Sequence, residues 1–159
     1  EYWFSSVIDH FDNNGADSAT YEMRYLVDET YFDSDSGPIL FYAGNEGDVW
    51  SFFDNSGFMT TTLAKEFKAK VVFAEHRFFG ESMPFGDQSF DRENLKFLTV
   101  EQAMMDYVEL VKFIRTDMNL EDRACIVFGG SYGGMLAGWL RMKFPQTFQG
   151  ALAMSAPIL

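Results

Sequence analysis

The sequence predicts an α/β protein with a mainly parallel sheet flanked by helices, and three observations support this class. Short apolar runs that suit buried strands alternate with longer segments of helical periodicity. After an early antiparallel strand, strands and helices follow one another in strict alternation, which favours parallel strands joined by right-handed crossovers. A Gly-x-Ser-x-Gly pentapeptide at 129–133 lies between one such strand and helix.

The composition sets limits on the class of protein. A chain of 159 residues, 47% apolar and 18% aromatic, suits a globular domain with a sizeable core or one piece of a larger domain. The net charge of −12 argues against nucleic acid or an anionic membrane as a partner, because no basic patch is present. No apolar run is long enough to span a membrane. The single cysteine, Cys125, is interpreted as a small buried apolar residue.

The elements can be placed from their patterns. Strands are predicted at 21–27, 39–43, 70–74, 125–128 and 150–154, and the first of them is expected to be antiparallel. Helices are predicted at 59–67, through 100–114 and at 135–144 before Pro145. Thr99 and Gln102 are predicted to form a capping box at the start of the second of these helices. The segment 78–97 lacks periodicity and is predicted to be a long loop of the functional kind.

The pentapeptide is the feature that indicates chemistry. A strand, a sharp turn and a helix around Ser131 form the context of a nucleophile elbow, in which the serine adopts a strained backbone conformation. Gly129, Gly133 and Gly134 lack side chains, so the strand and the helix can approach closely. Ser131 is therefore the predicted nucleophile, and the alternative is an ordinary glycine-rich turn.

A serine nucleophile also requires donors for the oxyanion. One is expected to be the backbone N–H of Tyr132, directly after the serine. The loop after the strand 39–43 is expected to supply the other from Asn45 or Glu46. This loop, Gly44-Asn45-Glu46-Gly47, also fits an ordinary turn between a strand and a helix.

The general base is missing from the expected place. α/β-Hydrolases follow the chain order Ser, Asp or Glu, His, but no Asp, Glu or His occurs after Ser131. The two histidines, His10 and His76, both precede it. His76 ends a strand at the same sheet edge and is the better placed, although beside Glu75 and Arg77 it also suits a structural ion-pair group. The acid and base are therefore expected beyond residue 159, and the sheet is expected to be truncated there.

Several longer motifs occur in a fixed order along the chain. They are Gly44–Asp48, Phe73–Arg77, Gly80–Ser82, Pro84–Gly86, Leu98–Ala103 and Gly129–Leu136, preceded by the segment 7–11. Together they resemble the lysosomal Pro-X carboxypeptidase and dipeptidyl peptidase II family of serine peptidases, and the resemblance covers nearly the whole chain.

The resemblance implies an α/β-hydrolase domain, with residues 1–159 as its N-terminal portion and with a helical cap and the C-terminal part lying outside them. It implies a serine exopeptidase that cleaves after a penultimate proline or alanine, with Ser131 as nucleophile, a peptide as substrate and no cofactor or metal. It also implies a lysosomal or secreted protein, and assembly into a homodimer stays open. The chain lacks a glycosylation sequon, and the segment 53–57 lacks a cysteine that some members carry.

Two branches of that family remain open. The segments 48–50 and 98–102 lean toward the dipeptidyl peptidases, which must bind a free α-ammonium with a carboxylate. Glu46, Asp48, Glu75 and Glu81 are the candidates, each of which also suits a solvated or ion-paired group. The alternative is a Pro-X carboxypeptidase, which must bind a carboxylate through Arg or His.

Two further alternatives lie outside that family. A lipase or esterase uses the same elbow, so the elbow does not discriminate between ester and amide substrates. A non-catalytic, hydrolase-like interaction domain is the other, and the intact Ser131 and its neighbouring loops argue against it.

Overall fold

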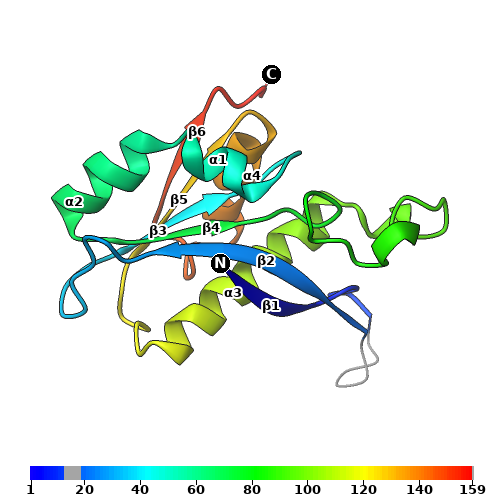
Figure 1. Cartoon of the computed structure of the whole chain (residues 1–159), viewed down its shortest axis with the longest axis horizontal. Coiled ribbons are helices and arrows are strands. Elements are labelled where there is room, and N and C mark those ends of the chain that lie inside the picture. Colours follow the sequence, from blue (N-terminus) through cyan, green and yellow to red (C-terminus); the bar gives the residue numbers. More distant parts are fainter. Residues whose placement is uncertain (13–18, 159) are drawn as a thin grey trace.

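The computed structural model describes residues 1–12 and 19–158. Within them, six strands form one sheet in the order β1-β2-β4-β3-β5-β6 (Figure 1). The strands are β1 Tyr2–Val7, β2 Thr20–Asp28, β3 Ile39–Ala43, β4 Lys70–Ala74, β5 Cys125–Gly130 and β6 Gly150–Met154. The strands β3 to β6 are parallel, whereas β2 pairs antiparallel with β4 and with β1. The predicted mainly parallel sheet with an early antiparallel strand is confirmed.

Helices cover both faces of the sheet (Figure 1). They are α1 Val49–Asp54, α2 Ala64–Phe67, α3 Val100–Asp117 and α4 Tyr132–Lys143. α1, α2 and a π-helical segment at Phe58–Leu63 pack on one face, whereas α3 and α4 pack on the other. The central strand β3 serves both cores: Phe41 faces α3 and α4, and Tyr42 faces α1. Every residue of β3 and β4 is buried, and apart from Lys70 at the start of β4 both strands are continuous apolar runs rather than alternating ones.

The sequence analysis does not anticipate β1 or α1. β1 is an edge strand whose Tyr2 and Trp3 are 54% and 45% exposed, so its apolar residues do not follow the alternation of a half-buried strand. α1 has six residues, which is too short to show helical periodicity. Its start is nevertheless marked by an N-cap, because the Asp48 carboxylate accepts a hydrogen bond from Trp50 N at 2.8 Å.

The capping box is only half correct. Thr99 caps α3 as predicted, because its hydroxyl accepts a hydrogen bond from Gln102 N at 3.3 Å. The Gln102 side chain does not turn back to Thr99. It accepts a hydrogen bond from His10 N at 2.9 Å and donates one to Asp9 at 2.6 Å, so it joins α3 to the N-terminal segment. The Gln102 side chain therefore makes a tertiary contact in place of the local hydrogen bond to Thr99 that a capping box requires.

The other predicted elements differ from the observed ones mainly at their ends. α4 begins at Tyr132, three residues before the predicted start, directly after the serine. The helix predicted at 59–67 is π-helical before it becomes α2. The long loop at 78–97 is confirmed and contains two short 3₁₀ turns, Gly86–Gln88 and Leu95–Phe97.

Candidate active site

Ser131 occupies a tight elbow between β5 and α4. Its backbone has φ 55° and ψ −125°, a conformation that non-glycine residues rarely adopt and that stores strain. The amide of Ser131 donates to Met154 O at the end of β6 over 3.0 Å, and its carbonyl accepts from Met135 N at 3.1 Å. The side chain is exposed at the carboxyl edge of the sheet. These are the features of a nucleophile elbow.

The glycines around Ser131 permit this geometry. A Cβ on Gly129 would overlap the carbonyl oxygen of Gly133, one turn away in α4. A Cβ on Gly133 would lie 2.7 Å from the carbonyl oxygen of Ala43, and one on Gly134 would lie 2.8 Å from that of Met154. The first turn of α4 therefore rests directly on the ends of β3 and β6.

The loop after β3 lies against the elbow. Tyr107 donates to the carbonyl of Gly44 at 2.7 Å, and the Asn45 side-chain amide donates to the carbonyl of Gly130 at 3.3 Å. Within residues 1–12 and 19–158, the backbone N–H groups of Asn45 and Glu46 have no hydrogen-bond acceptor. The N–H of Tyr132 is at the start of α4, where helical N–H groups lack intrahelical partners. The oxyanion role of these three groups stays a prediction.

Glu75 is engaged by several hydrogen-bond donors of the fold. Its side chain is fully buried and accepts hydrogen bonds from Arg24 at 2.7 Å, from Val49 N at 3.0 Å and from the hydroxyl of Ser82 at 2.8 Å. The N–H groups of Glu81 and Ser82 also donate to it, at 3.0 and 3.1 Å. With its oxygens occupied by these donors, Glu75 ties β2, α1 and the long loop together.

The remaining candidate carboxylates differ in their surroundings. Asp48 forms an ion pair with Arg24 and caps α1. Partial burial raises the pKa of Asp48, but hydrogen bonds from Arg24 and from Trp50 N outweigh this effect and leave it lowered. Glu81 and Glu46 are exposed and form no ion pair in the described part of the chain. Of the four, only Glu46 belongs to the loop beside the elbow.

Glu46 also lines a cavity of about 230 Å³ next to Ser131. The walls of this cavity are largely apolar and come from the long loop, the start of α3 and the start of α4. Its other lining residues are His76, Phe79, Leu98, Thr99, Val100 and Tyr132.

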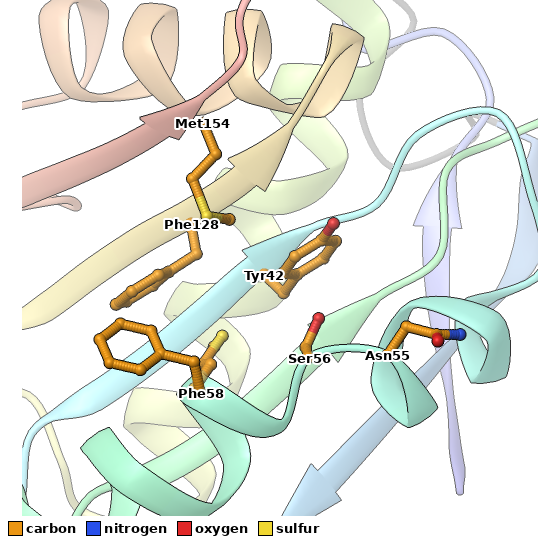
Figure 2. Close-up of a pocket in the computed structure, with 7 residues that line it drawn as sticks. Tyr42, Asn55, Ser56, Phe58, Phe128 and Met154 are labelled. Atoms are coloured by element: carbon orange, nitrogen blue, oxygen red, sulfur yellow. The ribbon is translucent and has the colours of Figure 1, made fainter.

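A second cavity, of about 140 Å³, lies on the opposite face of the sheet (Figure 2). Figure 2 shows Met154, Phe128 and Phe58 facing one another there, with Tyr42 beside them. One of its lining residues, Met154, accepts the Ser131 amide through its backbone carbonyl.

Neither histidine contacts Ser131. His10 Nε2 lies 2.7 Å from a carboxylate oxygen of Asp106. His76 Nδ1 lies 2.6 Å from the carbonyl oxygen of Arg77, and its Nε2 lies 3.0 Å from the hydroxyl of Tyr132. Both ring nitrogens of His76 are thus engaged, and its ring is 99% buried. Among the described residues, no hydrogen bond joins a histidine or a carboxylate to the Ser131 hydroxyl.

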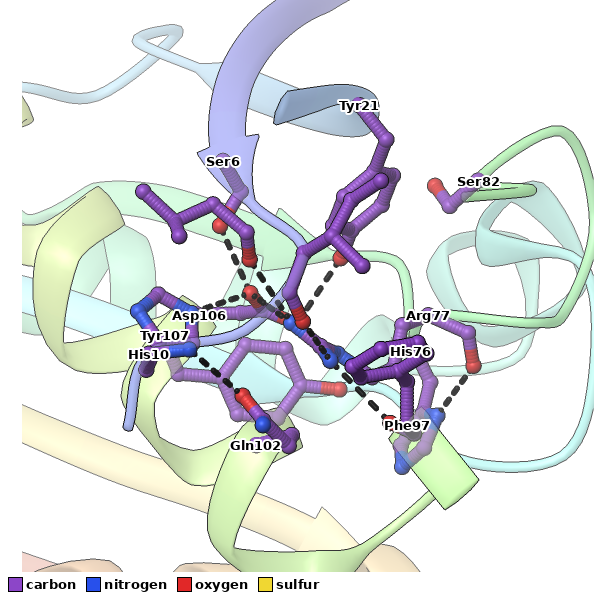
Figure 3. Close-up of polar contacts among 12 residues, drawn as sticks. Ser6, His10, Tyr21, His76, Arg77, Ser82, Phe97, Gln102, Asp106 and Tyr107 are labelled. Carbon is purple, nitrogen blue, oxygen red and sulfur yellow. Dashed lines mark hydrogen bonds and ion pairs between the residues drawn. The ribbon is translucent and has the colours of Figure 1, made fainter. Parts of the chain in front are cut away.

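The sequence analysis missed a buried polar cluster that supports this site (Figure 3). Its centre is Asp106 on α3, which accepts hydrogen bonds from Ser6, His10, Tyr21 and Arg77 at 2.6 to 2.8 Å. One signal was present in the sequence, because Asp106 falls on the apolar face of α3 beside Ala103 and Leu110. A carboxylate at such a position needs a buried partner.

Two observations concern the reactivity of the cysteine and the binding of metal ions. Cys125 is free and buried, and burial raises the pKa of its thiol to about 12, so it stays protonated. Across residues 1–12 and 19–158, no three His, Cys, Asp or Glu side chains converge as a metal-binding set.

The family model for the serine carboxypeptidases S28 matches residues 6–159. The chain belongs to this family. It is 52% identical to the human lysosomal Pro-X carboxypeptidase over 158 residues, which are 98% of this chain and 31% of that protein. It is 42% identical to a putative serine protease, pcp-1, of Caenorhabditis elegans, over 99% of this chain and 28% of that one. The chain thus spans about a third of the length of these relatives.

The structure also resembles solved α/β-hydrolases. An epoxide hydrolase from Vigna radiata matches 99% of this S28 chain and 39% of its own, with a TM-score of 0.63 and 12% identity. At that identity the similarity concerns the fold alone, which is the predicted α/β-hydrolase fold.

Proposed function

We propose that this chain carries the nucleophile and the oxyanion hole of a serine carboxypeptidase that removes the C-terminal residue following a proline. The observation that carries the proposal is Ser131, exposed on a strained elbow in a chain 52% identical to a lysosomal Pro-X carboxypeptidase. Membership of the S28 family supports a peptide as the substrate rather than an ester, the alternative that the elbow alone leaves open.

In the proposed reaction, Ser131 Oγ attacks the carbonyl carbon of the bond between proline and the last residue. A general base accepts the hydroxyl proton, and the carbonyl oxygen becomes an oxyanion. The N–H of Tyr132 and an N–H of Asn45 or Glu46 donate hydrogen bonds to that oxyanion. The base returns the proton to the leaving amine, and water then hydrolyses the acyl-enzyme.

We propose that the base and its orienting carboxylate come from parts of the protein outside these 159 residues. His10 and His76 are both engaged away from Ser131, which argues against either as the base. The relatives that match are about three times as long, so their remaining length has room for both groups.

The carboxypeptidase has more support than the dipeptidyl peptidase toward which the segments 48–50 and 98–102 lean. The mammalian relatives carry the former name. Two of the carboxylates suggested for an α-ammonium, Asp48 and Glu75, are already paired with Arg24. Glu46, an exposed carboxylate in the loop beside the elbow, still favours the dipeptidyl peptidase.

A lysosomal location is part of the proposal, because the mammalian relatives are named lysosomal. No helix in the described part of the chain is long and apolar enough to cross a membrane.

The first test is Ser131→Ala in the full-length protein. We expect turnover to fall by about 10⁴-fold or more with peptide binding retained, because the hydroxyl is needed for covalent chemistry and not for holding the substrate. Ser51→Ala on α1 is the matched control and should keep full activity. Turnover by Ser131→Ala above about a hundredth of the wild-type rate would contradict the assignment.

The second test compares three peptides on the wild-type protein: one ending in Pro-Phe, the same peptide amidated, and an Xaa-Pro reporter amide with a free N-terminus. We expect release of Phe from the free acid only. Release of the N-terminal dipeptide instead would establish the dipeptidyl peptidase.

A further inference from the structure

His76 lies behind the elbow in a cage of aromatic rings. Its ring centroid is 5.4 Å from that of Tyr132, 5.4 Å from that of Phe79 and 6.4 Å from that of Tyr107. It comes directly after β4 and Glu75, whereas Tyr132 comes directly after β5 and Ser131. Since β3 lies between β4 and β5, the contact between the two side chains bridges across the end of β3.

The hydrogen-bond direction in this bridge follows from the partners. The carbonyl of Arg77 can only accept, so His76 Nδ1 carries a hydrogen. Burial is the largest influence on the pKa of His76 and lowers it, so the imidazole is neutral and Nε2 is an acceptor. Tyr132 must then donate its hydroxyl hydrogen to Nε2. Burial, followed by Glu46 and Glu101, raises the pKa of Tyr132 to about 12, which keeps that hydrogen in place.

Arg77, whose carbonyl accepts the hydrogen bond from His76 Nδ1, is itself held in place. All five N–H groups of the Arg77 guanidinium are used: they donate to Asp106 and to the carbonyls of Val7, Ile8 and Phe97. Figure 3 shows Arg77 with Asp106 and Phe97, next to His76. The carbonyl that orients His76 therefore belongs to a residue that is held from several sides.

We propose that His76 is a positioning residue for the S28 reaction, which fixes the oxyanion-binding N–H of Tyr132 by accepting the Tyr132 hydroxyl. Tyr132 has two attachments. Its backbone follows the strained Ser131, and its side chain is anchored to the end of β4. The peptide plane that carries this N–H is held on its carbonyl side, where Ser131 O accepts from Met135 N at 3.1 Å. The N–H itself has no intrahelical partner, so the side-chain anchor adds a second restraint on its position. The inference rests on the proposed function, because it assigns a role within that reaction.

The test is a double-mutant cycle in the full-length protein, with Tyr132→Phe, His76→Gln and the double variant. Tyr132→Phe removes one oxygen and keeps the ring. We expect kcat to fall about tenfold with KM unchanged within about twofold, because an oxyanion contact acts in the transition state and not on bound substrate. A peptide aldehyde, which forms a tetrahedral adduct, should bind about tenfold more weakly, whereas product binding should not change. Tyr31→Phe, at an exposed tyrosine, is the matched control.

The cycle separates positioning from mere structural support. If His76 acts through the Tyr132 hydroxyl, the double variant loses no more than the worse single variant. Fully additive losses, or unchanged kcat in Tyr132→Phe, would overturn the proposal. Should His76→Gln fail to fold, the kcat and aldehyde measurements on Tyr132→Phe still test whether the Tyr132 hydroxyl positions the oxyanion-binding N–H.

A fluorophosphonate separates this inference from the proposed function, because it labels an active serine whatever peptide the enzyme prefers. Wild-type protein that is not labelled at Ser131 would overturn the proposed function. Wild-type and Tyr132→Phe proteins that are labelled at equal rates would overturn the role of His76 alone.

Discussion

At the scale of single residues, Asp106 determines how the N-terminal segment is held to the sheet. Burial raises the pKa of this carboxyl, but hydrogen bonds from Arg77, His10 and Ser6 outweigh burial and leave the pKa lowered. The carboxylate is therefore ionised and faces the fully buried guanidinium of Arg77. Removing one partner of such a pair leaves the other charge unpaired in the interior.

We expect Asp106→Asn to lower the free energy of unfolding of the full-length protein by about 3–5 kcal/mol, because Arg77 then lacks its counter-charge. Urea unfolding followed by tryptophan fluorescence measures this change. Asp117→Asn, at the exposed end of the same helix, should change it by less than about 0.5 kcal/mol. Equal effects of the two substitutions would show that the pair does not stabilise the fold.

The same carboxylate has a defined pH dependence. Since its pKa in the folded state lies below the ordinary 3.8, its stabilising effect is present above that value and is lost as the pH falls through the folded-state pKa. The difference in unfolding free energy between wild type and Asp106→Asn should therefore be constant from pH 7 to about pH 5 and shrink below about pH 4. A difference that shrinks between pH 7 and 6 would contradict this assignment to the Asp106 carboxylate.

At the scale of elements, β5 and α4 together contain glycines of two kinds. Gly129 and Gly133 lie where the strand and helix touch, whereas a Cβ on Gly138 would meet nothing within 4 Å. We expect Gly129→Ala to abolish activity and destabilise the fold, because its methyl group would overlap the backbone of Gly133.

Gly138→Ala is the matched control for that substitution. It should raise the free energy of unfolding by about 0.5–1 kcal/mol with activity unchanged, because alanine favours a helix interior. Thermal unfolding and peptide turnover of both variants check the pair. An active, stable Gly129→Ala protein would contradict the close contact.

The sequence predicted those elements whose own residues carry the signal for their structure. β3 and β4 show themselves as continuous apolar runs because both faces of each are buried, and the elbow shows itself through its glycines. β1 gave no such pattern, since its place depends on pairing with β2 rather than on its own burial. The hydrogen bond from Gln102 to Asp9 could not be predicted from a local pattern either, because the two residues lie 93 positions apart in the sequence.

The residues of the candidate site also fall into those set by short local motifs and those set by contacts between distant parts of the chain. Ser131 and the backbone groups of Asn45, Glu46 and Tyr132 are candidates from short motifs, so the sequence alone proposes them, and their roles stay predictions. The ion pairs that occupy Glu75 and Asp48 involve Arg24, which is 51 and 24 residues away. Such pairings depend on the order of strands in the sheet, and no spacing along the chain encodes them.

At the scale of the whole molecule, the proposed nucleophile Ser131 has no histidine or carboxylate in hydrogen-bonding contact among residues 1–12 and 19–158. We expect this segment, produced by itself, to react with a fluorophosphonate at least about 10³-fold more slowly than the full-length protein, because an unactivated serine is a poor nucleophile. Active-site labelling followed by mass spectrometry measures both rates. Rapid stoichiometric labelling of Ser131 in the segment would revive His76 as the base.

The hydrogen bond from the Ser131 amide to Met154 has a consequence for measurements in solution. In the 159-residue segment produced by itself, Met154 ends β6, an edge strand in which Ala151, Leu152, Ala153 and Met154 are all exposed, so this strand should open more readily than β3 or β4. Each opening removes the acceptor of the Ser131 amide. Deuterium uptake at this one amide therefore reports how often the outermost strand detaches, and any molecule that covers β6 should slow it.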